Sequence, residues 1–127
     1  MAHIVLNDIA LVQQALADPV RLLIVRLLVE RELCVCEIQS ALKEPQYKVS
    51  RHLAVLRNAG VVQSRKQGLW MHYELSHDLP KEWRATLEAL MQVLDASPET
   101  RSVLDRARAG TTRAPGSEAC CKPRCCS

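Results

Sequence analysis

Aromatic residues are scarce in this sequence of 127 residues, making up only 3% of it and including no phenylalanine. Proteins that grip single-stranded nucleic acid stack the bases on aromatic side chains, so this composition disfavours that class of binder. No apolar run approaches the ~20 residues that span a bilayer, so we expect no contact with a membrane. The hydrophobic core must be built from aliphatic side chains.

Signals for export and for catalysis are missing as well. The first residues carry no basic region and include Asp8, so we expect no signal peptide and a cytoplasmic protein. His52 and His72 have no acid or nucleophile at a catalytic spacing, and the four glycines form no phosphate-binding loop. The sequence therefore predicts that the protein is not an enzyme. In the cytosol its six cysteines should be reduced thiols rather than a disulfide framework.

The first third of the chain has the pattern of short helices in one domain. Apolar residues recur over residues 4–17, and Asp18 followed by Pro19 is a strong helix start, with a capping carboxylate and then proline at the first position. The next helix, over residues 20–31, is apolar almost all round and is therefore expected at the centre of the core. A short helix is expected over residues 35–42.

Residues 46–75 carry the functional interpretation. After a turn at residues 43–45, an amphipathic helix runs up to Gly60, which is placed as glycine commonly is after a helix end. Its two faces differ in polarity. The apolar face holds Val49, Leu53 and Leu56, and the opposite face holds Tyr47, Arg51, Ala54 and Asn58.

A two-stranded ribbon follows this helix. Residues 70–75 alternate at period two, which is typical of a half-buried strand, and residues 61–66 are the expected partner across a tight turn at Gln67-Gly68. A helix that fits a major groove, followed by a β-hairpin that can reach the adjacent backbone, is typical of a winged helix-turn-helix protein. We therefore predict a mainly α fold with a β-hairpin wing.

Positive charge is concentrated in the same stretch. Residues 43–66 hold six basic side chains and one acidic one, a net charge of +5, whereas the whole chain carries +3, so the remainder carries −2. Charge alone fits a solvated basic face equally well, but the helix and ribbon favour double-stranded operator DNA as the partner. The residues expected to contact DNA are Gln46, Lys48, Ser50, Arg51 and His52 on the helix, with Arg65 and Lys66 on the ribbon.

A long amphipathic helix is expected over residues 81–96, and after Pro98 residues 99–109 add a last helical piece. The apolar stripe of the long helix has no obvious partner inside so small a domain. We therefore predict that it pairs across a two-fold axis in a homodimer; the alternative is that it completes the core of one chain. The predicted interface residues are Trp83, Leu87, Leu90 and Leu94.

The DNA-binding and dimerisation domain thus covers residues 1–109, and residues 110–127 differ from it in composition. They are rich in Gly, Pro, Ser and Thr and have almost nothing to bury, so a disordered tail is expected. Its cysteines match no complete zinc motif, although Cys121 and Cys125 have three residues between them, and the usual unit has two to four. A tail that scavenges metal ions and a tail that regulates are both consistent with its four cysteines, Cys120, Cys121, Cys125 and Cys126.

Cys34 and Cys36 lie at the start of the third expected helix. A helix N-terminus favours thiolate over thiol, and thiolates select soft metal ions. Helical positions two residues apart point ~200° apart, so the pair can hold one ion only if the first turn unwinds. Such a distortion next to the DNA-reading helix would change DNA affinity. The alternative is a pair of idle cysteines.

The chain resembles the ArsR/SmtB family of metal-responsive repressors in three motifs that occur in order: ELCVCEI at 32–38, KVSRHLAVLRNAGVV at 48–62 and RKQGLWMHYELS at 65–76. The resemblance covers about residues 5–95 and is greatest to the arsenical-resistance operon repressors. It implies a homodimeric winged helix-turn-helix repressor of an arsenic-resistance operon. Such a repressor leaves its operator when arsenite or antimonite, As(III) or Sb(III), binds cysteine thiolates.

Two positions depart from the family pattern. Gln39 stands where the arsenical repressors carry a third cysteine, so a third thiol must come from the tail or the site works with two. Pro45 replaces the polar residue usual before the reading helix. Residues 81–96 contain no histidine, so the zinc site that some relatives build there looks absent. A repressor that responds to Cd(II), Zn(II) or oxidants, and a metal-sequestering protein, remain as alternatives.

Overall fold

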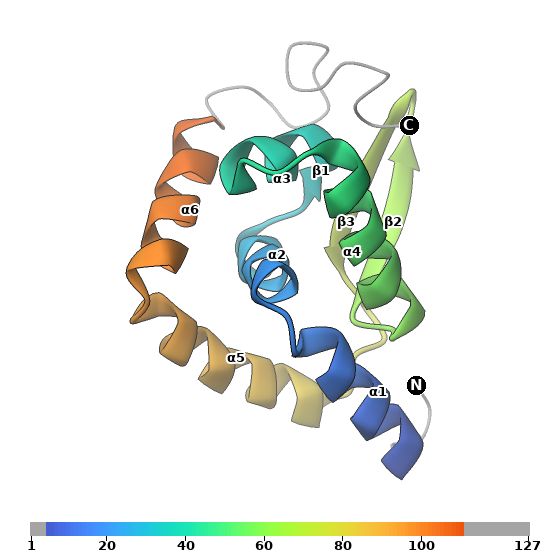
Figure 1. The fold of residues 1–127 in the computed structure, drawn as a ribbon. Coiled ribbons are helices and arrows are strands. Elements are labelled where there is room, and N and C mark those ends of the chain that lie inside the picture. The colour runs from blue at the N-terminus through green and yellow to red at the C-terminus, as the bar shows by residue number, and fades with distance from the viewer. Residues whose placement is uncertain (1–4, 111–127) are drawn as a thin grey trace.

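The computed structural model describes residues 5–110, which form six helices and a small antiparallel sheet around one core (Figure 1). Helix α2 lies at the centre, between α4 with the β-hairpin on one side and α5 with α6 on the other (Figure 1). The elements in chain order are α1 Leu6–Leu16, α2 Pro19–Glu30, β1 Leu33–Cys34, α3 Val35–Leu42, α4 Gln46–Asn58, β2 Val62–Gln67, β3 Trp70–Leu75, α5 Lys81–Asp95 and α6 Pro98–Ala109.

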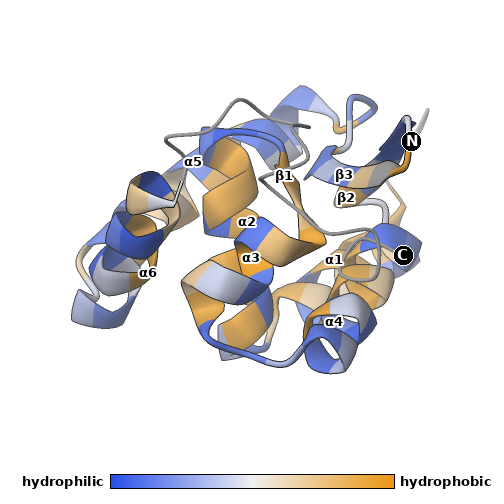
Figure 2. Ribbon diagram, turned by 90° about the horizontal axis from the view of Figure 1, so that it is seen from above, coloured by the Kyte–Doolittle hydropathy of each residue, from blue (hydrophilic) through white to orange (hydrophobic). Residues whose placement is uncertain are grey.

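Helix α2 begins where the sequence predicts. The Asp18 carboxylate accepts hydrogen bonds from the backbone N–H groups of Val20, at 2.8 Å, and Arg21, at 3.2 Å, and so satisfies donors that have no partner inside the helix. Ile24 and Val25 are fully buried, which confirms the central position expected for this helix. Figure 2 shows the hydrophobic stretches of α2 and α3 gathered in the middle of the molecule.

Helices α3 and α4 form the helix-turn-helix. Lys43 ends α3 in the left-handed conformation, with φ 57°, and Pro45 stands at the N-cap of α4 without a capping side chain. The buried face of α4 consists of Val49, Leu53 and Leu56, as its periodicity predicts. Only residues 43–45 separate the two helices.

The wing is a β-hairpin, but its turn lies one residue later than predicted. Gln67 pairs with Trp70, so the loop residues are Gly68 and Leu69 rather than Gln67 and Gly68. Gly68 has φ 63°, and a positive φ at the first loop position is what a type II′ turn requires of its glycine. The sequence also missed β1, a strand of two residues that pairs with β3 and gives the sheet the order β1-β3-β2.

Helix α5 packs much of its apolar stripe against the core of its own chain. Trp83 and Leu87 are only 6% and 3% exposed in the single chain, so the expectation that the stripe lacks a partner inside the domain is wrong for these two residues. Leu90 and Leu94 are half-buried against the same core. The sequence alone could not show this, because which part of the chain packs against the apolar stripe of α5 depends on the tertiary structure.

Helix α6 contacts both α2 and α3. Arg106 Nε donates to the carbonyl oxygen of Ala41 near the end of α3, at 2.7 Å, and Arg108 Nη2 donates to the Glu30 carboxylate of α2, at 2.6 Å. The hydrogen bond from Arg108 lowers the pKa of the Glu30 carboxyl below its usual value. Within residues 5–110, every helix is too short or too polar to cross a membrane.

Candidate nucleic-acid interface and thiol site

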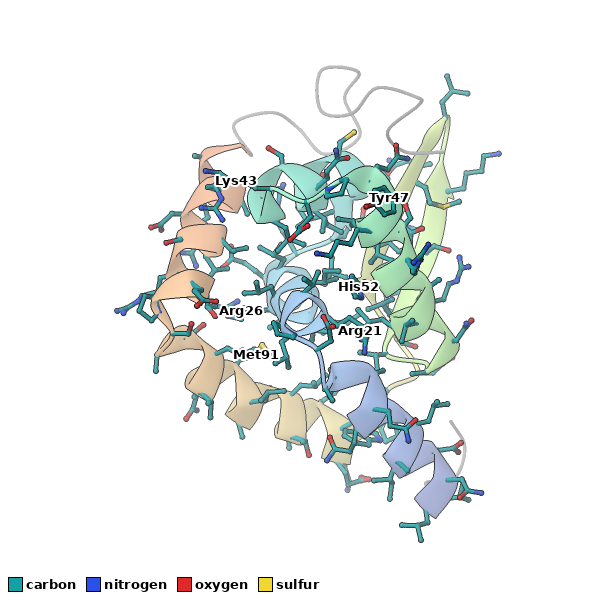
Figure 3. The ribbon with its side chains drawn as sticks, viewed as in Figure 1. Arg21, Arg26, Lys43, Tyr47, His52 and Met91 are labelled. Atoms are coloured by element: carbon teal, nitrogen blue, oxygen red, sulfur yellow. The ribbon has the colours of Figure 1, made fainter. Side chains whose placement is uncertain are left out.

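Helix α4 turns its polar face to solvent. Arg51 is exposed, and Tyr47 at the start of the helix is 69% exposed. Tyr47 is labelled in Figure 3. Ser50 and Gln46 are half-buried. The ammonium group of Lys48 lies 3.2 Å from the Glu44 carboxylate, one turn earlier. Arg51 therefore lies on the outward surface of α4 together with Tyr47, the most exposed large hydrophobic side chain of this helix, which was placed on the polar face but not among the predicted DNA contacts.

His52 has a structural contact that the sequence did not reveal. Its Nδ1 lies 3.1 Å from Nη1 of Arg21, and both side chains lie between α2 and α4 (Figure 3). A guanidinium can only donate, so Nδ1 of His52 is the acceptor in this contact. Arg21 also donates to the carbonyl oxygen of Ala15, at 2.6 Å. His52 thus connects α4 to the end of α1, and its contact with DNA stays a prediction.

The two basic residues of the wing differ in their surroundings. Lys66 is exposed, and within residues 5–110 it pairs with no acidic side chain. Arg65 is half-exposed, and its guanidinium donates to the carboxylate of Glu32, the residue just before β1. On the wing, the positive charge of Lys66 is therefore unrestrained, whereas that of Arg65 is held in place by Glu32.

His72, on β3 of the wing, differs from its neighbours in the burial of its side chain. It belongs to the predicted DNA-reading segment, yet its side chain is completely buried. Its Cα partners are Cys34 on β1 and Arg65 on β2. Its Nδ1 lies 3.7 Å from a Glu32 oxygen, and neither ring nitrogen has a hydrogen-bond partner among the described residues.

A second carboxylate, that of Glu74, lies beside this group. Partial burial raises the pKa of Glu74, but the hydrogen bond from Gln63, at 2.8 Å, and the neighbouring positive charges outweigh that effect. The pKa of Glu74 is therefore below its usual value. The base of the wing is a cluster of charged side chains, and the sequence predicted only its basic members.

The two cysteines at the start of α3 have different surroundings. Cys34 is 1% exposed, ends β1 and is the N-cap of α3, where it forms a capping box with Glu37. The Glu37 carboxylate accepts from the Cys34 backbone N–H at 3.0 Å. Cys36 is half-exposed and borders an open hollow of ≈ 400 Å³ with Gln39 and Lys43. Cys34 lies outside the helix in extended conformation, so the geometry expected of two helical positions does not apply.

Ligands beyond this pair were expected in the tail. Within residues 5–110, no three cysteine, histidine or acidic side chains come together in a group that could hold a metal ion. Gln39, where a third thiol would stand, lies beside Cys36 at the hollow. The predicted ligands Cys120, Cys121, Cys125 and Cys126 lie outside the described residues.

Comparison with known sequences points to one family. Residues 18–64 match the family described as bacterial regulatory protein, arsR family. The arsenical resistance operon repressor of Escherichia coli is 53% identical over 73 residues, which are 57% of this chain and 62% of that protein, less than two thirds of its length. An arsenic resistance transcriptional regulator of Pseudomonas putida is 44% identical over 93 residues, 70% of this chain and 68% of the relative.

Comparison with solved structures agrees with the sequence match. HlyU from Vibrio cholerae superposes with a TM-score of 0.62 and 34% identity, covering 68% of this chain and 91% of that one. A homodimeric winged helix-turn-helix DNA-binding domain from Mycobacterium bovis superposes with a TM-score of 0.61 and 33% identity, covering 72% of this chain and 81% of that one.

Proposed function

The chain belongs to the ArsR family of bacterial regulatory proteins, which are DNA-binding transcriptional regulators and not enzymes, and from this membership we propose that it represses an arsenic-resistance operon. Arsenite or antimonite, bound by Cys34 and Cys36, releases it from the operator. The alternatives with Cd(II), Zn(II) or oxidants use the same thiols, and titration with each inducer separates them. A protein that only sequesters metal would bind ions and show no salt-dependent DNA binding.

The observation that carries the proposal is the place of the two thiols in the fold. They flank the first residue of α3, and α3 leads through the left-handed Lys43 and then Pro45 into α4. An inducer acts only if it binds one of two states more tightly than the other. Ligation that pulls on the start of α3 shifts α4 in the groove, and this supplies the difference in affinity.

The two thiols at α3 suit a soft, thiophilic ion, but a third donor is needed. Two thiols are present at α3, and arsenite takes up to three, so a cysteine of the tail, Cys120, Cys121, Cys125 or Cys126, supplies the third. The end of α6, after which the tail follows in the sequence, lies close to α3, because Arg106 contacts the last turn of α3. A flexible chain reaches roughly 5–6 Å × √n over n residues, so a cysteine 10 or more residues after Gly110 reaches tens of ångströms.

Operator binding is the direct test of the proposed function. The full-length protein is expected to bind DNA from upstream of its own gene, with an affinity that falls as salt rises. Sodium arsenite is expected to weaken this binding by about 5- to 150-fold, the usual range of allosteric coupling. Fluorescence anisotropy with a labelled duplex measures both, and a scrambled duplex is the control. Specific operator binding that arsenite does not change would refute the response to arsenic, but it would still support the role as a repressor.

Dimerisation through α1 and α5 is part of the same proposal. These helices lie side by side, since Ile9 and Gln13 line one hollow together with Trp83. Because Trp83 and Leu87 are buried within the chain, the apolar surface left for a partner consists of exposed residues on the two helices and at the N-cap of α1. These are Val5, Leu6 and Leu11 at the start of the chain and Val93 on α5.

Val93→Glu is expected to give monomers and weak operator binding. Val93 is 69% exposed, so the new carboxylate is harmless in one chain but would be buried without a partner in the dimer, at roughly 3 kcal/mol or more. Sedimentation velocity measures the change. The control is Leu69→Glu, which puts the same charge on an equally exposed residue, 76% exposed, at the tip of the wing and should leave the dimer intact. A dimeric Val93→Glu protein would place the interface elsewhere.

A further inference from the structure

Strand β1 joins the thiol site to the wing. Leu33 pairs with Tyr73 and Cys34 with His72, so the segment just before α3 is hydrogen-bonded to the inner strand of the hairpin. Cys34 is at the same time the N-cap of α3. A movement of Cys34 therefore changes the start of α3 and the pairing of β1 with β3 together.

Three polar side chains cross the sheet in a row at this level. Cys34, His72 and Arg65 are successive cross-strand partners on β1, β3 and β2, and such partners lie on the same face of a sheet. The thiol and the imidazole are 1% and 0% exposed, whereas the guanidinium reaches solvent. The row thus runs from the proposed inducer site inside the molecule to a predicted phosphate contact on its surface.

Glu32 bridges the outer part of this row. Its carboxylate accepts from the Arg65 guanidinium, and its Oε1 lies 3.7 Å from His72 Nδ1. Glu32 is two residues before Cys34 and directly precedes β1. A carboxylate that holds one edge of a guanidinium fixes its plane and leaves other N–H donors for a phosphate. The orientation of Arg65 therefore depends on where the segment of Cys34 lies.

Ligation of one ion by both thiols disturbs this arrangement. Cys34 is packed against the sheet in extended conformation, with φ −87° and ψ 166°, while Cys36 faces the open hollow from the first turn of α3. Because Cys34 is 1% exposed and its side chain takes part in the capping box of α3, binding of one ion together with Cys36 at the hollow is expected to turn Cys34 away from this position. That turn strains its pairing with His72 and moves Glu32.

We propose that Glu32 is the positioning residue through which a soft ion bound at Cys34 acts on the wing. In the DNA-bound form Glu32 holds Arg65 toward the phosphate backbone. When Cys34 moves to ligate the ion, Glu32 moves with β1 and Arg65 loses that orientation. This route acts beside the displacement of α4, and it rests on the proposed function because it uses the same thiols and the same DNA.

The test compares operator affinity with and without sodium arsenite for the full-length protein and for Glu32→Gln, Arg65→Gln and the double variant. The readout is the ratio of the two affinities, so a change in basal affinity does not affect the conclusion. The wild-type ratio, expected at about 5- to 150-fold, should fall several-fold in either single variant, and the double variant should resemble Arg65→Gln alone. Arsenite affinity without DNA, followed by the absorbance of the arsenic–thiolate bonds, should stay unchanged.

Asp95→Asn is the matched control, because it also removes a carboxylate that pairs with an arginine, Arg26 of α2, but at the end of α5, away from β1 and the two thiols. It should leave the ratio as in the wild type. A wild-type ratio in both Glu32→Gln and Arg65→Gln would overturn the role of Glu32 while the proposed function stands. No arsenite response in the wild-type protein would overturn both. If Glu32→Gln does not fold, Arg65→Gln tests the same link from its other end.

Discussion

Replacing both Cys34 and Cys36 by serine is expected to abolish release by As(III) and to leave operator binding intact. A hydroxyl is a hard, protonated donor and does not replace a thiolate on a soft ion. The fold should tolerate the change, because Cys34 is the N-cap of α3 and serine is among the best N-cap residues. The wild-type response of about 5- to 150-fold should shrink to none, as measured by anisotropy with and without arsenite.

Truncation after Gly110 is the companion variant, since it removes every tail cysteine and keeps Cys34 and Cys36. It should retain DNA binding and bind As(III) more weakly, because the third thiol is lost. An unchanged As(III) response after truncation would show that two thiols are enough. If the serine double variant still responds and the truncated protein does not, the inducer site lies in the tail and its placement at α3 is wrong.

Arg51→Ala is expected to weaken operator binding by about 5- to 150-fold and to relax its sequence preference, since a bidentate arginine–base contact contributes ~1–3 kcal/mol. Arg51 is exposed on the outward face of α4, and within the described residues it pairs with no acidic group. Competition between operator and random duplexes measures both effects.

Lys66→Ala on the wing is the contrasting variant. It should weaken operator and random duplexes alike and reduce the salt slope by ~1, which is the signature of a phosphate contact. Arg57→Ala, an exposed arginine at the other end of α4, controls for the simple loss of positive charge on the same helix. Unchanged operator affinity in Arg51→Ala would remove this helix from the reading role.

Where periodic signals are local, the sequence predicted the structure well. Helix α3 has the predicted bounds, and the buried face of α4 follows from spacing alone. Asp18 before Pro19 started α2 as expected, because a side-chain cap acts within one turn of chain. The turn of the wing was placed one residue early, because Gln67 and Gly68 both suit a turn and only the strand register shows which residue needs positive φ.

Tertiary structure decided what no local pattern contains. Period two assigned His72 to one face of a strand, but its complete burial depends on β1, a strand of two residues that is too short to leave a periodic signal. The partner of Arg65 is Glu32, 33 residues away in sequence. Trp83 and Leu87 form an apolar stripe by sequence, and only the packing of α5 against its own chain shows that this stripe belongs to the core. Spacing along one element determines which side chains share a face, whereas what covers that face depends on residues distant in the chain.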